Sequence, residues 1–469
     1  MGSVRDFGAS GNGKDDDTAA IEHALEMSDG DIVFPRGNYR ITRPLVIDLT
    51  RLNRTSIRGL GGLAKLIMAG PGPAFSFVGT HTSNAAPKNF KPVVWERERL
   101  PTVEGIEIEG AHPQADGIHI EGVMQATLSR VLIREVRTAV HIFKRARNVL
   151  INACHFYHNS GIGVHLDHVN LHQCIISSSH ISYCRLGGIR IDGGEVRNLQ
   201  ITGNDIEYNN GASHQAAFPD AMAQPTAEIY IDVQEGSVRE GTISSNTIQA
   251  TLSPNGVNIR LIGSPKVNDL FGLFAISGNL IGHQETNLHL THAWGVTISG
   301  NHIYGATNRN LFIENSRNIV VGPNSIGQMP DFNASGLGTG IRFVNSENCV
   351  LSGLQVQEDQ ARENEAPPVI PEKRDALVEW VNCRRFNMNG CQIIDGTPIG
   401  VLVQDCQTGS IQQCQIVDSR STPQMAVGID LRGKQQEIVI GNCQIYGATE
   451  TPIRGLPNPG VLTTNNITG

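Results

Sequence analysis

A short alternating motif recurs through most of this chain and constrains its fold more than any other feature. Each copy alternates apolar and polar residues, as a short strand with one buried face does. Successive copies begin about 22 to 40 residues apart, the spacing of turns in a solenoid. Clear copies are GIHIEG (117–122), AVHIFK (139–144), GVHLDH (163–168), GIRIDG (188–193), EIYIDV (228–233), GVNIRL (256–261), NLFIEN (310–315) and GIDLRG (428–433).

A second motif follows in each turn, in forms such as ITGNDI, ISSNTI and ISGNHI. Two or three strands per turn, with Asn, Gly or Ser at the corners, predict an all-β parallel β-helix whose turns stack on one shared core. The repeated Asn is expected to bind corner backbone groups, and the cysteines are expected to stack as buried thiols without disulfides. These positions are Asn204, Asn246, Asn279 and Asn301, and Cys391, Cys414 and Cys443.

The domain organisation follows from where the repeat begins. Residues 1–45 hold one helical stretch, AAIEHALEM, which Asp17 or Thr18 can cap. A solenoid needs its open end covered, so we interpret 1–45 as an N-terminal cap. Residues 46–469 are expected to form a single elongated β-helix domain.

The string VRDFGASGNGKDDDTAAI, followed by VFPRGNY, resembles the start of the pectate-lyase-like superfamily. This resemblance implies a right-handed, single-stranded parallel β-helix of the pectin-lyase type that acts on or binds polysaccharide. The polygalacturonase signatures Asn-Thr-Asp, Asp-Asp, Gly-His-Gly and Arg-Ile-Lys are absent as written, so the resemblance implies no catalytic residue.

Composition bears on partners and location. The net charge is −8 and the pI is about 6.1, which argues against nucleic acid as a partner. The sequence has no apolar run of membrane-spanning length, so no membrane partner is expected. No signal peptide is visible, and we expect a secreted or periplasmic protein whose signal was removed before Val4.

The outward positions of the early repeats form the candidate site. Identical positions in neighbouring turns lie about 4.8 Å apart, so these side chains should form columns. The predicted catalytic carboxylates are Asp167, Asp192 and Asp232. The predicted substrate-binding residues are His119, His141, His165, Arg190, Glu121 and Tyr230, together with Trp95 in the long loop 79–100.

We expect a glycoside hydrolase that uses two of the three carboxylates. One turn separates adjacent members, close to the spacing of a retaining pair, and two turns approach that of an inverting pair. Repulsion between like charges should raise the pKa of one carboxyl toward the acid role. Asp192 lies between the other two and is the first candidate for removal. No cofactor or resident metal is expected for hydrolysis.

Three alternatives remain open. A polysaccharide lyase would use Arg190 or a His as base, with Ca²⁺ on the stacked carboxylates. The stacked His119, His141 and His165 with Asp167 could instead bind a transition metal. A non-catalytic, tailspike-like carbohydrate binder would need aromatic residues but no pair of carboxylates. His168 and other corner histidines are expected to make corner hydrogen bonds rather than to act as ligands.

Long loops between strands and apolar outward residues in the later turns lead to two further expectations. Loops 79–100 and 209–227 are expected to flank the site, and 358–376 is a third insertion. Trp95 offers a face on which a sugar ring can stack, and nearby cations suit acidic sugars. Phe312, Val344 and Leu402 are expected to face outward and to support a homotrimer.

Overall fold

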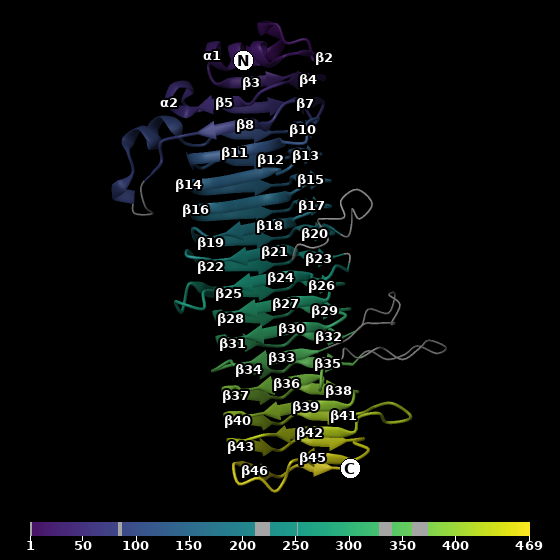
Figure 1. Cartoon of the computed structure of the whole chain (residues 1–469). Helices are drawn as coiled ribbons and strands as arrows, with labels where there is room; N and C mark the ends of the chain where they lie inside the picture. The colour runs from purple at the N-terminus through teal and green to yellow at the C-terminus, as the bar shows by residue number, and fades with distance from the viewer. Residues whose placement is uncertain (1, 83–86, 212–225, 251, 328–339, 359–373) are drawn as a thin grey trace. The chain divides into compact units, whose positions relative to one another are not determined.

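A computed structural model describes residues 2–82, 87–211, 226–250, 252–327, 340–358 and 374–469 (Figure 1). Its contacts divide the chain into two compact units, Met1–Thr242 and Ile243–Gly469. The expected single domain over 46–469 therefore stays a prediction. Most of the expected loops 209–227 and 358–376 lies outside the described residues. No helix among those residues is both long and apolar enough to cross a membrane.

In unit 1, each complete turn gives one strand to each of three parallel stacks (Figure 1). Stack I contains β5 (Leu45–Asp48), β8 (Gly72–Val78), β11 (Ala115–Met124), the first parts of β14 (Val140–Asn152) and β16 (Ile162–Ser177), β18 (Gly187–Asp192) and β21 (Ala227–Asp232). Stack II contains β1 (Gly2–Ser3), β3 (Asp31–Phe34), β6 (Ser56–Gly59), β9 (Thr102–Glu104), β12 (Thr127–Ser129), the second parts of β14 and β16, β19 (Glu195–Thr202) and β22 (Ser237–Ser244), in which the unit ends. Stack III contains β2 (Asn12–Asp16), β4 (Gly37–Ile41), β7 (Ala64–Met68), β10 (Glu107–Gly110), β13 (Leu132–Arg134), β15 (His155–Tyr157), β17 (His180–Ser182) and β20 (Asp205–Glu207).

The core of unit 1 results from the register in which neighbouring strands pair. Ile120, Ile142, Leu166, Ile191 and Ile231 pair in sequence along stack I, and each is fully buried. Burying one such side chain stabilises the fold by about 1.5–3 kcal/mol, so a continuous aliphatic column holds the turns together. The side chain between two of these residues must then point away from the core.

The helical segments of unit 1 are η1 (Val4–Phe7), α1 (Thr18–Met27), α2 (Leu49–Leu52), η2 (Pro87–Asn89) and η3 (Val94–Glu98). Helix α1 buries Ile21, Ala24 and Leu25 and contacts η1 and β5, as expected of a cap. Asp17 occupies the N-cap position without capping the helix. Its carboxylate instead accepts hydrogen bonds from the backbone N–H groups of Ser10 and Gly11, because the preceding loop folds over it.

Unit 2 repeats the same three-strand turn. Its stack I contains β24 (Val257–Ile262), β27 (Thr286–Thr291), β30 (Arg309–Glu314), β33 (Ile341–Val344), β36 (Val378–Val381), β39 (Ile399–Gln404), β42 (Val427–Arg432) and β45 (Thr451–Arg454). Its stack II contains β25 (Phe271–Ser277), β28 (Trp294–Ser299), β31 (Arg317–Val321), β34 (Val350–Ser352), β37 (Arg384–Asn389), β40 (Gln407–Gln412), β43 (Gln436–Gly441) and β46 (Val461–Thr464). Its stack III contains β23 (Thr247–Gln249), β26 (Leu280–Gly282), β29 (His302–Tyr304), β32 (Ser325–Gly327), β35 (Gln355–Gln357), β38 (Gln392–Ile394), β41 (Gln415–Val417), β44 (Gln444–Tyr446) and β47 (Ile467–Thr468).

The predicted ladders of Asn and Cys are confirmed. In unit 2 the amide oxygen of Asn279 accepts the backbone N–H of Asn246, and Asn301 does the same for Asn279, both at 3.0 Å. In unit 1, Asn204 accepts from Ser179 N–H at 3.0 Å. All nine cysteines are buried free thiols.

The expected outward placement of Leu402 is wrong. Leu402 is 1% exposed and packs with Ala376, which lies just before β36, and with Ile399 and Val427, the first residues of β39 and β42. Phe312 is half-buried, and its ring stacks on His289 at a centroid distance of 4.8 Å. The homotrimer stays a prediction, but Leu402 offers it no exposed surface.

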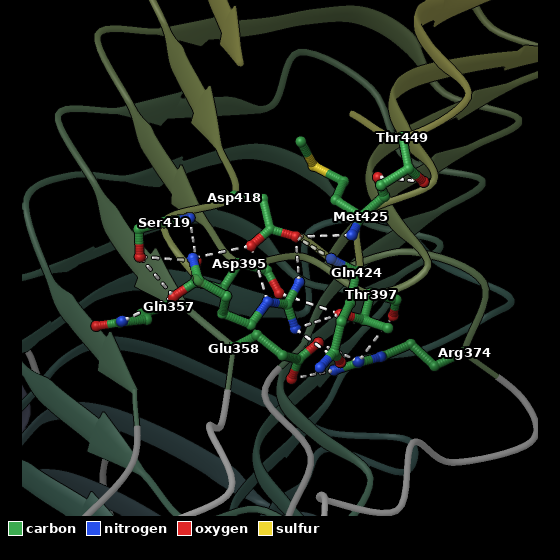
Figure 2. Close-up of polar contacts among 11 residues, drawn as sticks. Gln357, Glu358, Arg374, Asp395, Thr397, Asp418, Ser419, Gln424, Met425 and Thr449 are labelled. Atoms are coloured by element: carbon green, nitrogen blue, oxygen red, sulfur yellow. Dashed lines mark hydrogen bonds and ion pairs between the residues drawn. The ribbon is translucent and has the colours of Figure 1, made fainter. Parts of the chain in front are cut away.

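A buried polar network ties together the corners after stack III in unit 2 (Figure 2). Asp418 accepts hydrogen bonds from Arg420 and from the backbone N–H groups of Gln424 and Met425, the last two at 2.6 and 2.7 Å. Asp395 similarly accepts from Ser419 N–H at 2.6 Å and from Gln357 at 3.0 Å. These carboxylates replace the strand hydrogen bonds that an irregular corner lacks.

We predict that Asp418→Asn destabilises this corner by about 3–5 kcal/mol, the cost of breaking a buried ion pair. Burial alone would raise the pKa of Asp418, but Arg420 and the two backbone donors lower it to about 2. The stabilisation is therefore complete above the pKa of an unfolded aspartate and is lost as pH falls toward 2.

Hydrogen exchange at the amides of Gln424 and Met425 measures the local stability of this corner. Asp375→Asn is the control, because Asp375 forms an exposed pair with Arg432. Unchanged exchange in Asp418→Asn would contradict the prediction.

Candidate functional site

The predicted column lies along stack I of unit 1. His119 pairs with His141, His141 with His165, His165 with Arg190, and Arg190 with Tyr230. All five side chains are half-buried on the outer side of the strands. The His141 and His165 rings stack with centroids 5.2 Å apart, close to the spacing of neighbouring strands. The predicted strand register is confirmed.

The carboxylates form a second column beside the first. Asp167, Asp192 and Asp232 pair in register two residues beyond His165, Arg190 and Tyr230. His141 Nε2 lies 3.0 Å from Asp167 Oδ2, and His165 Nε2 lies 2.9 Å from Asp192 Oδ2. The two columns therefore interlock, because the imidazoles of His141 and His165 each reach the carboxylate of the next turn.

Asp192 is held more tightly than an outward residue is expected to be. It is buried, with 8% of its surface exposed, and Arg190 donates from Nε to Oδ2 at 2.6 Å and from an Nη to Oδ1 at 3.1 Å. The Arg190 guanidinium also lies 4.6 Å from the centroid of the Tyr230 ring. Tyr230 in turn donates a 3.3 Å hydrogen bond to Asp232.

The expectation that one of these carboxyls has a raised pKa is wrong for Asp167 and Asp192. Burial alone would raise the pKa of Asp192, but His165 and Arg190 lower it to about 2. The pKa of Asp167 is also lowered, because hydrogen bonds from His168 and His141 outweigh its burial. Burial lowers the pKa of His141, so its neutral form is favoured. Imidazole and guanidinium partners thus cancel the repulsion between like charges on which the prediction depended.

Asp116 is a site residue that the sequence reasoning missed. It lies at the start of β11, is 1% exposed, and accepts 3.0 and 2.6 Å hydrogen bonds from Arg137. Its Oδ2 is also 3.2 Å from His119 Nε2. Burial would raise its pKa, but His119 and Arg137 lower it to about 2. The Ala-Asp-Gly string that opens β11 is typical of a turn in the sequence, so no pattern separates this Asp from a corner residue.

His168 is the second missed residue. It lies at the corner after stack I with φ of 44°, and this left-handed bend turns its ring back toward the strand. Its Nδ1 is 2.7 Å from Asp167 Oδ1, and its Nε2 is 3.0 Å from Gln234 Oε1. The hydrogen bond to Asp167 raises the pKa of His168. His168 is thus a corner hydrogen-bonding residue, as predicted, and one of its partners is the candidate carboxylate Asp167.

Glu121 and Trp95 lie outside the interlocked columns. Glu121 forms a 2.5 Å ion pair with Lys144. Trp95 belongs to η3, is 47% exposed, and has the Arg99 guanidinium 4.6 Å from its ring centroid. Their roles in binding substrate stay predictions.

A groove of about 690 Å³ begins at the end of the loop that carries Trp95. Arg99 and Leu100 line it from the loop, and Arg54 adds a second cation. Its other walls come mainly from amide and aliphatic side chains of the corner before stack II and of stack II itself: Gln125, Thr127, Asn148, Val149, Leu150, Gln173, Ile175, Asn198 and Gln200. The sequence did not predict this groove, because its walls come from separate turns.

A third polar cluster lies on stack III. His180 Nε2 is 2.9 Å from Asp205 Oδ2, and the Tyr157 hydroxyl hydrogen-bonds His180 Nδ1. Burial, the charge of Asp205 and a hydrogen bond with it raise the pKa of Glu207 to about 7. A carboxyl group with a raised pKa, which was expected in the Asp column, thus occurs on stack III instead.

Comparison with known proteins supports the fold. Residues 93–218 match the family described as "Right handed beta helix region". No curated protein matches the sequence significantly. Among solved structures, the A-module of mannuronan C-5 epimerase AlgE4 from Azotobacter vinelandii is 12% identical with a TM-score of 0.39, over 98% of this chain and 99% of that one.

Two other solved structures are similar to the same degree. PfbA, a surface adhesin of Streptococcus pneumoniae, is 12% identical with a TM-score of 0.42, over 99% of this chain and 91% of that one. The catalytic unit of GH87 alpha-1,3-glucanase from Streptomyces thermodiastaticus is 12% identical with a TM-score of 0.39, over 100% of this chain and 68% of that one. The strand register and the family match therefore identify a right-handed parallel β-helix, as the resemblance to the pectate-lyase-like superfamily predicts.

Proposed function

We propose that this chain is a carbohydrate-active enzyme that cleaves an acidic polysaccharide along the stack I column of unit 1. The column combines three imidazoles, one guanidinium group and an aromatic ring, spaced by the strands at a repeat that suits an extended chain. Imidazoles can exchange protons near neutral pH, and guanidinium groups attract carboxylates. Fold alone does not specify this activity, so the proposal depends on these side chains.

β-Elimination at a uronate residue fits the column better than hydrolysis does. Hydrolysis requires one protonated carboxyl that can donate to the leaving oxygen. Both oxygens of Asp192 already accept hydrogen bonds from Arg190, and both oxygens of Asp167 lie within hydrogen-bond distance of a histidine ring. These carboxylates are placed to orient imidazole and guanidinium groups rather than to carry a proton.

His119 is the base that the geometry favours, and its contact with Asp116 is the observation that carries the proposal. With a proton on Nε2, His119 donates to the buried Asp116, which Arg137 holds, and Nδ1 keeps the lone pair that takes the substrate proton. His119 removes the proton on the carbon next to the uronate carboxylate. The electron pair forms a C=C bond, the glycosidic C–O bond breaks, and the leaving oxygen takes a proton from water.

We predict that a panel of uronate-containing and neutral polysaccharides gives an ultraviolet-absorbing product together with new reducing ends, and only from uronate polymers. His119→Ala should lower kcat by about 10²–10⁴-fold, the usual contribution of a general base. His155→Ala on stack III is the matched control, because it removes an exposed imidazole outside the column. Reducing ends without absorbance would indicate hydrolysis, and binding without either product would indicate a non-catalytic protein.

Asp192→Asn provides a second test of the column. The substitution keeps the shape of the side chain but weakens its hold on Arg190 and His165, so kcat should fall by about 10²–10⁴-fold in a folded protein. Circular dichroism checks folding. Unchanged turnover would place the active site elsewhere, with the groove beside Arg99 and Leu100 as the next region to test.

A second candidate function, glycoside hydrolysis at Asp205 and Glu207, is favoured by one observation. Glu207 has a pKa of about 7 beside a second carboxylate, as a general acid requires. Under this alternative, Glu207→Gln abolishes release of reducing ends while His119→Ala does not. The two variants together separate the candidates.

The pKa of Glu207 can be tested without a substrate. Burial raises it first, and the negative charge of Asp205 raises it further. Asp205→Asn should therefore lower the pKa of Glu207, although burial keeps it above that of an exposed glutamate. Carbon-13 NMR of labelled glutamate carboxyls measures the titration, with Glu207→Gln identifying the resonance. A pKa that does not fall in Asp205→Asn would contradict the coupling.

A further inference from the structure

Three side chains in the middle of the column bring metal-ligand atoms together. One ring nitrogen each of His141 and His165 and one carboxylate oxygen of Asp167 all lie within 4.8 Å of one another. In the part of the chain that the structure describes, they are the one group of three or more His, Cys, Asp or Glu residues that meets this criterion. The two imidazoles come from neighbouring strands, and Asp167 follows His165 by two residues on the same outer face.

The arrangement is close to the size of a coordination sphere. Zinc bonds to nitrogen and oxygen are about 2.0–2.2 Å long, so neighbouring ligand atoms around one ion are about 3.3 Å apart. His141 Nε2 and Asp167 Oδ2 are already 3.0 Å apart. Separations of up to 4.8 Å close to this value with a change of at most about 1.5 Å, which side-chain rotation can supply.

Neighbouring groups hold the ligand side chains in place. His168 Nδ1 contacts the other oxygen of Asp167 at 2.7 Å and is itself fixed by Gln234 at 3.0 Å. Asp192 contacts His165 at 2.9 Å. Such outer partners orient ligands in metal sites, and losing one costs about 10–100-fold in metal affinity. The side chains of His141, His165 and Asp167 are 22%, 16% and 34% exposed, so an ion and a substrate can both reach them.

We propose that His141, His165 and Asp167 bind one divalent transition-metal ion of the zinc type. Two imidazole nitrogens favour Zn²⁺ over Ca²⁺ and Mg²⁺, which prefer oxygen ligands. Three protein ligands leave at least one position for an oxygen atom of a substrate or water. This inference rests on the proposed function in one respect, since the open position would take the uronate carboxylate and neutralise its charge. His119, one turn away with its ring centroid 4.9 Å from that of His141, would then face the same sugar.

Isothermal titration calorimetry of the chelator-treated full chain with Zn²⁺ tests the proposal. We expect one ion per chain, with no comparable binding of Ca²⁺. His141→Ala and Asp167→Asn should weaken Zn²⁺ binding by more than 100-fold, and His168→Ala by about 10–100-fold. Asp167→Asn keeps the side-chain volume, and circular dichroism verifies that each variant folds.

His289→Ala in unit 2 is the matched control. His289 Nε2 lies 2.9 Å from Glu314 Oε1, so the wild type holds a second pair of imidazole and carboxylate outside the three-ligand group. Zn²⁺ binding should be unchanged in this variant. Binding of Co²⁺, with the visible absorption of a four-coordinate site, should disappear in Asp167→Asn and persist in His289→Ala.

The metal site and the proposed function can fail separately. Absence of stoichiometric Zn²⁺ binding, or binding that survives both His141→Ala and Asp167→Asn, would overturn the metal site whatever the activity. Full eliminase activity after chelation would overturn the role of the ion and leave the proposed function standing. Stoichiometric binding in a protein that cleaves no polysaccharide would support the site and reject the proposed function.

Discussion

The parallel hydrogen-bond ladder between successive turns is the constraint on which the rest of each unit depends. A single turn cannot bury its apolar face or pair its strand edges, so its residues become ordered only against the next turn. The ladder fixes identical positions about 4.8 Å apart, and one residue of slippage would move every buried side chain outward. The same register therefore places the fully buried column from Ile120 to Ile231 on the inner face of the strands and the interlocked His and Asp columns on their outer face.

Much of this register could be predicted from the sequence because the alternation has a period of two and recurs in every turn. Apolar positions such as Ile142 and Leu166 identify the inner face, and the intervening His141 and His165 must then share the outer face. The corner Asn residues are equally predictable, because an amide can both donate to and accept from backbone groups of adjacent turns. Local pattern and stacking geometry agree at these positions.

The sequence was less informative wherever a contact depends on a corner or on a connection between stacks. Leu402 occupies an outward position, but Ala376, Ile399 and Val427 at the starts of neighbouring strands pack against it and bury it. Asp116 and His168 lie at corners, where polar residues usually satisfy the backbone, and only the chain's bends aim them at His119 and Asp167. Periodicity describes strands, and it carries no information on how an irregular segment directs its side chains.

The pairing of charges is the deepest reason why the candidate chemistry could not be predicted from spacing alone. Three stacked carboxylates suggest mutual repulsion, yet Asp192 is ionised more readily than an ordinary aspartate because Arg190 and His165 contact it. Asp205 and Glu207 are two residues apart on one strand, and there burial and an adjacent charge raise the pKa of a carboxyl. In a β-helix, residues two positions away on the same strand and residues stacked on the neighbouring turn together decide whether a carboxylate serves as an anchor, a ligand or an acid. These partners differ from turn to turn, so the same outward motif can have different chemistry in adjacent turns.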